Sequence, residues 1–214
     1  MTNRPNTFII AEAGVNHNGS ISLARKLVDA AVAAKADAVK FQSFVASSIV
    51  TNSATKADYQ IAQTGNQETQ LEMLQRLELT HTQQRELFEY CKTSGIEFLS
   101  TPFDSDSLRF LVSDLNLSTI KIGSGELTNA PFLLEVAKCT DKIILSTGMS
   151  TIDEIELALG VIAFGMTTDK TAKPSTVECK KALESDAGRK TLIKRVTLLH
   201  CTTDYPTSPA DINL

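Results

Sequence analysis

The chain has 214 residues, of which 42% are apolar, with a mean hydropathy close to zero and a formal charge of −4. Such a chain is long enough for one large globular domain, and it lacks the basic surplus that nucleic-acid binding usually needs. No apolar run approaches the roughly 20 residues of a membrane span, and Glu12 comes too early for a signal-peptide core. We therefore expect a cytoplasmic protein that acts on small molecules, without nucleic-acid or membrane partners.

Short apolar runs recur along the chain, each followed by a polar tip and then by a helical pattern. The first run, 7–14, precedes a helix over 20–35 with Ser20 as its N-cap. The apolar residues at helical spacing, which should face the core, are Leu23, Leu27, Ala30 and Ala31. A second strand is expected at 36–42.

The same alternation continues to the sixth strand. The further strands are expected at 96–103, 119–126, 142–149 and 196–206. The helices are expected at 79–95, from about Asp104, at 130–139 and at 150–165. In the first of these helices, Thr80 and Gln83 have the spacing of a capping box and Gly95 fits a C-terminal stop.

Apolar strands that alternate with helices indicate a parallel sheet covered by helices, either doubly wound or closed as a barrel. A doubly wound nucleotide-binding fold usually carries G-x-G-x-x-G after its first strand, and residues 12–19, "EAGVNHNG", lack it. Instead, nearly every strand ends in reactive or hydrogen-bonding side chains, as the C-terminal face of a barrel requires. These residues are Glu12, Lys40, Gln42, Ser100, Thr101, Lys121, Ser124, Glu126, Ser146, Thr147, His200, Thr202 and Thr203. We therefore predict an α/β fold, a (β/α)8 TIM barrel truncated after the sixth strand, with residues 1–214 as its N-terminal part.

Two segments interrupt this rhythm. The connection 43–79 is unusually long, and long connections in compact enzymes often carry a lid or a binding loop. Residues 167–195 form a basic insertion with eight Lys or Arg and four Asp or Glu. This insertion is either a solvated surface excursion or a contact with a subunit or a polyanion.

The charged residues at the strand ends suggest an anion site. Lys40 and Lys121, beside hydroxyl side chains, would suit phosphate or carboxylate, although a salt bridge at the rim is the alternative for each. Glu12 could act as an acid or base, orient water or support a metal, or it could neutralise one of these lysines. Glu126 suits sugar hydroxyls, or it begins a helix.

The histidines and cysteines give no metal or disulfide pattern. His17 and His200 are candidates for hydrogen bonds near the site or are structural, whereas His81 should be exposed in the first turn of its helix. The cysteines are scattered without a C-x-x-C pair, and we interpret all of them as reduced thiols: Cys91, Cys139, Cys179 and Cys201.

Six motifs in this order resemble the sialic acid synthase family, which includes legionaminate and pseudaminate synthases. The motifs are "FIIAEAGVNHNG", "VKFQ", "STPFD", "IKIGSGE", "ILSTGM" and "LLHCTTDYPT". The family condenses phosphoenolpyruvate with N-acetylmannosamine, or a related acetamido sugar, to give a nonulosonic acid such as N-acetylneuraminate and phosphate. The resemblance therefore implies a transferase with a (β/α)8 barrel and a divalent cation, manganese or magnesium, at its mouth.

The resemblance also implies roles for individual residues. Glu12 would be catalytic, because it would position the metal-bound water. The residues that would bind phosphoenolpyruvate are Lys40, Thr101, Lys121, Ser124, Ser146 and Thr203, the last of which is an asparagine in many relatives. The residues that would face the amino sugar are Gln42, Asn66, Glu126 and Tyr205.

The family has further parts that this sequence does not contain. Its metal ligands are two histidines in later motifs, so we expect no metal ligand within residues 1–214. Its C-terminal antifreeze-like domain lends an arginine to the partner's site in a homodimer, and we expect residues 1–214 not to include that domain. We therefore expect the full-length protein to be a homodimer and this piece to be inactive alone.

Two other functions remain open from the residues. One is a Schiff-base aldolase that uses Lys40 or Lys121, which would need a lysine in an apolar pocket. The other is an inactive fragment that binds phosphoenolpyruvate without turnover.

Overall fold

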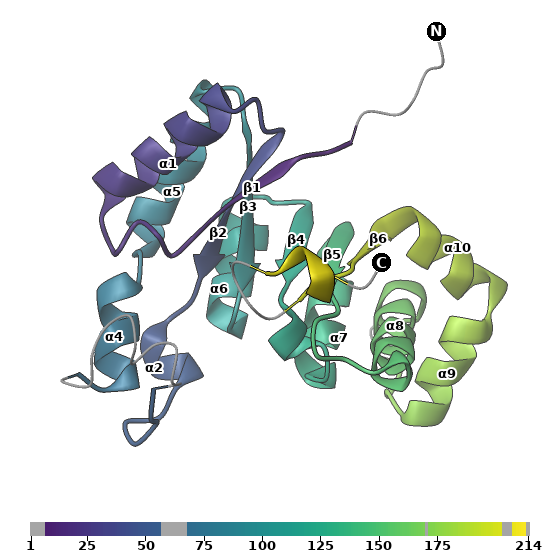
Figure 1. Cartoon of the computed structure of the whole chain (residues 1–214). Coiled ribbons are helices and arrows are strands. Elements are labelled where there is room, and N and C mark those ends of the chain that lie inside the picture. Colours follow the sequence, from purple (N-terminus) through teal and green to yellow (C-terminus); the bar gives the residue numbers. More distant parts are fainter. Residues whose placement is uncertain (1–6, 57–67, 170, 203–206, 213–214) are drawn as a thin grey trace, which may run out of the picture. The chain divides into compact units, whose positions relative to one another are not determined.

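Each half of the chain forms a three-stranded parallel sheet. The computed structural model describes residues 7–56, 68–169, 171–202 and 207–212 (Figure 1). The chain divides into two compact units, 1–115 and 116–214. The strand order is β1-β2-β3 in the first unit and β4-β5-β6 in the second, and all neighbouring strands are parallel. The six strands predicted from the sequence are therefore present, in sequential order, with crossover connections between them.

Helices cover the sheet of the first unit. Its elements are β1 (Ile10–Gly14), α1 (Ile21–Ala33), β2 (Ala38–Ser43), α2 (Ala46–Ile49), α4 (Gln70–Leu77), α5 (His81–Thr93), β3 (Glu97–Pro102), α6 (Ser105–Arg109) and the π-helical turn η1 (Phe110–Asp114). The predicted caps of α1 and α5 are confirmed, because Ser20 accepts a hydrogen bond from the Leu23 amide and Thr80 forms a capping box with Gln83. The chain leaves α5 through Gly95 at a φ of +72°, as a helix stop requires.

The buried face of α1 differs from the predicted one. The residues that the helix buries are Ala24, Val28 and Ala31, whereas Leu23 is 39% exposed and Ala30 is exposed. Small side chains at 24 and 31 allow α1 to lie close to the strands and to α5, which runs beside it (Figure 1). The prediction is confirmed for Ala31 and wrong for Leu23 and Ala30, whereas Leu27 is half-buried, and Ala24 and Val28 complete the buried face.

The long connection after β2 contains helices α2 and α4, and residues 57–67 lie outside the described part. Lys56 and Glu68 form an ion pair of 3.1 Å across those residues, and the same carboxylate pairs with Arg76 at 3.0 Å. Lys56 is buried. These ion pairs thus join the two described parts of the connection.

The second unit has the same strand–helix alternation. Its elements are β4 (Thr119–Ile122), the 3-10 turn η2 (Ser124–Glu126), α7 (Ala130–Cys139), β5 (Lys142–Ser146), α8 (Ile152–Thr167), α9 (Thr176–Glu184), α10 (Asp186–Arg195), β6 (Val196–Leu199) and the 3-10 turn η3 (Pro209–Asp211). Its core is built from Ile120, Ile122, Leu133, Leu145 and Ile162, all fully buried. None of the helices described in either unit is long and apolar enough to cross a membrane.

The basic segment 167–195 forms α9 and α10, which pack beside α8 (Figure 1). Gly160 of α8 allows the close approach, since a Cβ at this position would lie 2.9 Å from the carbonyl oxygen of Cys179. Cys179 and Ala182 are buried in this contact. A solvated excursion is therefore an incomplete description, because the segment has a buried face as well as its charged outer one.

Candidate active site

The strand register places three of the predicted residues on one face of the first sheet. Lys40 of β2 pairs with Leu99 of β3, and Gln42 pairs with Thr101 two residues further on. Since side chains alternate between the faces of a sheet, Lys40, Gln42 and Thr101 share a face near the carboxyl ends of the strands. Lys40 and Thr101 are both buried.

The opposite face of the same strands carries a different polar group. The Ser43 hydroxyl donates to Gln84 Oε1 at 2.5 Å and lies 2.7 Å from the Ser100 hydroxyl. Gln84 belongs to α5, so these groups lie between the sheet and its helical cover. Ser100, which the sequence pattern grouped with the strand-end site, therefore belongs to the packing of α5.

Glu12 and Lys40 form an ion pair between neighbouring positions of β1 and β2. The Lys40 side chain is 11% exposed and the Glu12 side chain 50%. The proposed alternative, that Glu12 neutralises a lysine, is thus confirmed for Lys40, but the exposed carboxylate remains available to other groups.

Gly14 lies close to both the Glu12 carboxylate and the Gln42 side-chain amide. A Cβ at Gly14 would lie 3.3 Å from Glu12 Oε1 and 3.7 Å from Gln42 Nε2, and the backbone φ there is +53°. The positive φ favours glycine, and a Cβ at this position would crowd the Glu12 carboxylate. Gly14 was not among the predicted site residues, although a glycine at the end of a strand is a signal that could have identified it.

His17 follows β1 and is only 1% exposed. Its Nδ1 accepts a hydrogen bond of 3.0 Å from the Gly19 amide, and its ring lies 6.1 Å from that of Phe41, on the face of β2 opposite Lys40. Its Nε2 has no hydrogen-bond partner among the described residues. Burial lowers the pKa of His17, so the ring is held neutral. These contacts favour the structural alternative for this residue.

The second unit holds the other lysine. Lys121 of β4 is 6% exposed, and its ammonium donates to the Ile122 carbonyl oxygen at 2.7 Å. It pairs with Ile144 of β5, so Ser146, two residues later, lies on the same face. Ser146 is also buried. A buried ammonium and a hydroxyl thus share the carboxyl ends of β4 and β5.

Three strand ends meet at Gly148. A Cβ on this glycine, which follows β5, would lie 3.3 Å from Ser124 Oγ and 3.6 Å from Cys201 Cβ. Ser124 begins the turn after β4, and Cys201 follows β6. The structure therefore brings Ser124 and Cys201 together, and the sequence analysis assigned no role to Gly148 or Cys201 in the site.

The remaining candidates have other environments. The Glu126 carboxylate accepts a hydrogen bond of 2.7 Å from Asn129, the N-cap of α7, which is consistent with its alternative role at a helix start.

His200 is exposed and bonds through Nε2 to the Ile212 carbonyl oxygen at 2.6 Å. His81 is exposed, as predicted, and stacks on Phe110 at 4.0 Å between ring centres. Asn66, Thr203 and Tyr205 lie outside the described residues.

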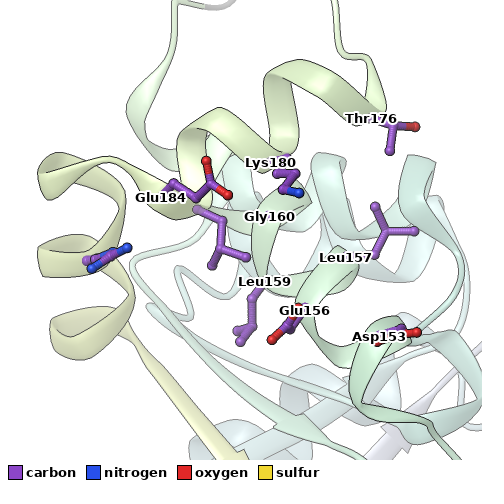
Figure 2. A pocket seen from close by; sticks show the side chains of 10 residues that line it. Asp153, Glu156, Leu157, Leu159, Gly160, Thr176, Lys180 and Glu184 are labelled. Carbon is purple, nitrogen blue, oxygen red and sulfur yellow. The ribbon is translucent and has the colours of Figure 1, made fainter.

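A separate cavity of about 560 Å³ lies among α8, α9 and α10 (Figure 2). Its lining residues are Asp153, Glu156, Leu157, Leu159, Gly160, Thr176, Lys180, Leu183, Glu184 and Arg189. None of the predicted site residues that the structure describes lines this cavity, so the cavity lies apart from the described strand-end residues of the second unit.

Comparison with known proteins gives one consistent result. The sequence model of the NeuB family matches residues 27–214. The N,N'-diacetyllegionaminic acid synthase of Campylobacter jejuni is 45% identical over 97% of this chain and 55% of its own length. The N-acetylneuraminate-9-phosphate synthase of Drosophila melanogaster is 32% identical over 97% of this chain and 48% of its own length. The chain thus spans about half the length of the curated relatives it matches.

Solved structures agree with the sequence comparison. The N-acetylneuraminic acid synthetase of Leptospira borgpetersenii, determined in complex with citrate, superimposes with a TM-score of 0.68 at 28% identity. The match covers 96% of this chain and 57% of that protein. The predicted fold class, a parallel α/β barrel to which these residues contribute six strands, is confirmed.

Proposed function

The chain belongs to the NeuB family, and from this premise we propose that the protein condenses phosphoenolpyruvate with an acetamido sugar to give a nonulosonic acid and phosphate. The observation that carries the proposal is the pair of buried lysines, Lys40 and Lys121, each on a face that also presents a hydroxyl group near the carboxyl ends of the strands. Buried ammonium groups beside hydroxyls suit a ligand with several negative charges, such as phosphoenolpyruvate.

The donor contacts follow from the same residues. By their match to the family motifs, the residues proposed to bind the phosphate and carboxylate of phosphoenolpyruvate are Lys40, Thr101, Lys121, Ser124 and Ser146. Thr203 is proposed as a further contact. Fixed cations of this kind hold the donor in line and compensate its charge without rearrangement.

The acceptor is proposed to meet a more polar group of side chains. Gln42 and Glu126 offer an amide and a carboxylate for sugar hydroxyls and the acetamido group, and Asn66 and Tyr205 are proposed alongside them. Relatives at 45% and 42% identity are N,N'-diacetyllegionaminic acid synthases. We therefore propose a diacetamido sugar as the first acceptor to test, with N-acetylmannosamine as the second.

In the proposed reaction, carbon 3 of phosphoenolpyruvate forms a bond to the aldehyde carbon of the open-chain sugar, while the aldehyde oxygen takes the electron pair of the C=O π bond and a proton and becomes a hydroxyl group. Water adds to carbon 2 of the donor, and the C–O bond to phosphate then breaks, so that phosphate leaves and a keto group remains. Glu12, half exposed beside Lys40, is the proposed group that orients this water and accepts its proton.

A divalent cation, manganese or magnesium, remains part of the proposal for the family. Within the described residues, no three His, Cys, Asp or Glu side chains are close enough to hold a metal ion. The ligands are proposed to lie outside residues 1–214, together with the homodimer contacts. A cytoplasmic location, where phosphoenolpyruvate is available, is also proposed.

The test is phosphate release from phosphoenolpyruvate with manganese and either acceptor, with the product identified by mass. The 214-residue chain should be compared with a version extended to the length of its relatives. We expect release that requires both substrates in the extended version and none in the shorter chain. Absence of release in both, across several acetamido sugars, would overturn the proposal. Borohydride trapping gives a separate control, because only the aldolase alternative forms an imine that can be reduced.

A further inference from the structure

In the turn after β5, the residue with a positive φ is Met149, not the neighbouring Gly148. Met149 adopts a φ of +61° and is 79% exposed, whereas Gly148, immediately before it, is outside the left-handed region. Glycine adopts a positive φ at almost no cost, and methionine does not. The backbone conformation of this turn therefore gives no reason for glycine at position 148.

The reason for glycine at position 148 is the lack of room for a side chain there. A Cβ at Gly148 would lie 3.3 Å from Ser124 Oγ, 3.7 Å from Ser124 Cβ and 3.6 Å from Cys201 Cβ. The contact with the hydroxyl oxygen is tighter than most Cβ contacts in proteins, so a methyl group would push the Ser124 hydroxyl by a few tenths of an ångström. The atoms nearest to Gly148 all belong to side chains of neighbouring strand ends.

These neighbours differ from those of the glycines that serve helix packing. At Gly165 in α8, a Cβ would lie 2.7 Å from the Cβ of Ala137, a buried residue of α7. Ser124 and Cys201, by contrast, are both partly exposed. The space beside Gly148 is therefore bordered by the Ser124 hydroxyl and the Cβ of Cys201, whose thiol donates to the Leu199 carbonyl oxygen at 3.3 Å.

We propose that Gly148 is a positioning residue of the phosphoenolpyruvate site, where the missing side chain leaves the Ser124 hydroxyl in place to bind the donor. This inference rests on the proposed function, because it assigns Ser124 to the donor. It also makes the Cys201 side chain part of the wall of that site, although Cys201 itself is not proposed to react.

A double-mutant cycle tests the coupling. Phosphoenolpyruvate affinity should be measured by calorimetry for the wild type, Gly148→Ala, Ser124→Ala and the double variant. When Ser124 is present, we expect Gly148→Ala to weaken phosphoenolpyruvate binding at least fivefold. In the Ser124→Ala background the same substitution should weaken binding less than twofold, because there is no hydroxyl to displace. Met149→Ala alters the same turn without adding an atom near Ser124 and should bind like the wild type.

Alkylation provides a readout that needs no turnover. Phosphoenolpyruvate should slow the reaction of Cys201 with iodoacetamide, measured residue by residue by mass spectrometry, and Gly148→Ala should weaken this protection. Cys139, exposed on α7, is the internal control and should react at the same rate with and without the donor.

The outcomes separate this inference from the function. If the wild type binds phosphoenolpyruvate and Gly148→Ala loses the same factor in both backgrounds, or Cys201 is not protected, the positioning role is wrong and the proposed function stands. If the wild type does not bind phosphoenolpyruvate at all, the positioning role of Gly148 and the proposed function are both wrong.

Discussion

The ion pair between Glu12 and Lys40 joins a half-exposed carboxylate to a nearly buried ammonium. Removing an ammonium from water is unfavourable unless a negative group accompanies it. The carboxylate supplies that charge, but an anionic donor that approached Lys40 would compete with it. The proposed catalytic use of Glu12 is therefore compatible with its ion pair with Lys40. The ion pair itself should weaken donor binding, because the carboxylate competes with the donor for Lys40.

Glu12→Gln should separate these effects. We expect phosphoenolpyruvate affinity to stay equal or increase, because a competing charge is removed, while phosphate release falls about 100-fold, the usual contribution of a positioned acid or base. Calorimetry and the phosphate assay measure the two quantities. Glu97→Gln, at the exposed amino end of β3, should change neither. Weaker donor binding in Glu12→Gln would contradict the competition.

His17 makes the stability of the fold depend on pH. Burial lowers its pKa below the ordinary value of 6.5, so the unfolded chain takes up a proton at a higher pH than the folded one. Stability therefore rises with pH through this window and is lost as the pH falls below about 6.5 towards the lower, folded pKa. One such group gives a slope of at most about 1.4 kcal/mol per pH unit.

Urea unfolding at several pH values between 7.5 and 5 would measure this slope. His17→Phe should show a weaker dependence on pH than the wild type, whatever its absolute stability. Equal slopes in the two proteins would show that other groups cause the effect.

Among the elements, helix starts follow from local chemistry and helix contacts do not. The capping boxes of α4, α5 and α8 each join an N-cap threonine to a side chain three residues later, a pattern visible in the letters alone. The contact of α8 with α9 depends on Gly160, whose neighbour Cys179 is 19 residues away in sequence. No local pattern indicates that pairing.

Gly160→Ala should destabilise the second unit. Alanine favours the helix by about 1 kcal/mol, but its methyl group would lie 2.9 Å from a backbone carbonyl of α9, which cannot rotate away. Overpacking of this kind costs about 1–3 kcal/mol, so we expect a net loss in urea unfolding. Val177→Ala, at an exposed position of α9, is the matched control and should stay within about 0.5 kcal/mol of the wild type. A gain in stability for Gly160→Ala would indicate that α9 can move aside.

For the whole molecule, the proposed donor should act as a stabiliser, because it binds the folded chain and not the unfolded one. At 100 times its Kd, phosphoenolpyruvate should add about 2.7 kcal/mol to the free energy of unfolding. Lys121→Met should lose this increment, since the buried ammonium is a proposed donor contact. Lys138→Met removes an exposed lysine of α7 and should keep it.

Thermal melts with and without phosphoenolpyruvate measure the increment. An equal increase in Tm for wild type and Lys121→Met would remove Lys121 from the donor site without touching the rest of the proposal.

The amino-acid sequence by itself determined the order of strands and helices, their caps, and the lysines and hydroxyls at the strand ends, because these signals are local. The tertiary structure decided which of these groups meet. Strand register turned Thr101 towards Lys40 and Ser100 towards α5, and it brought Glu12 beside Lys40. Likewise, the neighbours of Gly148 come from strands on both sides of β5. Such contacts join residues tens of positions apart, and packing, which no short pattern encodes, selects among them.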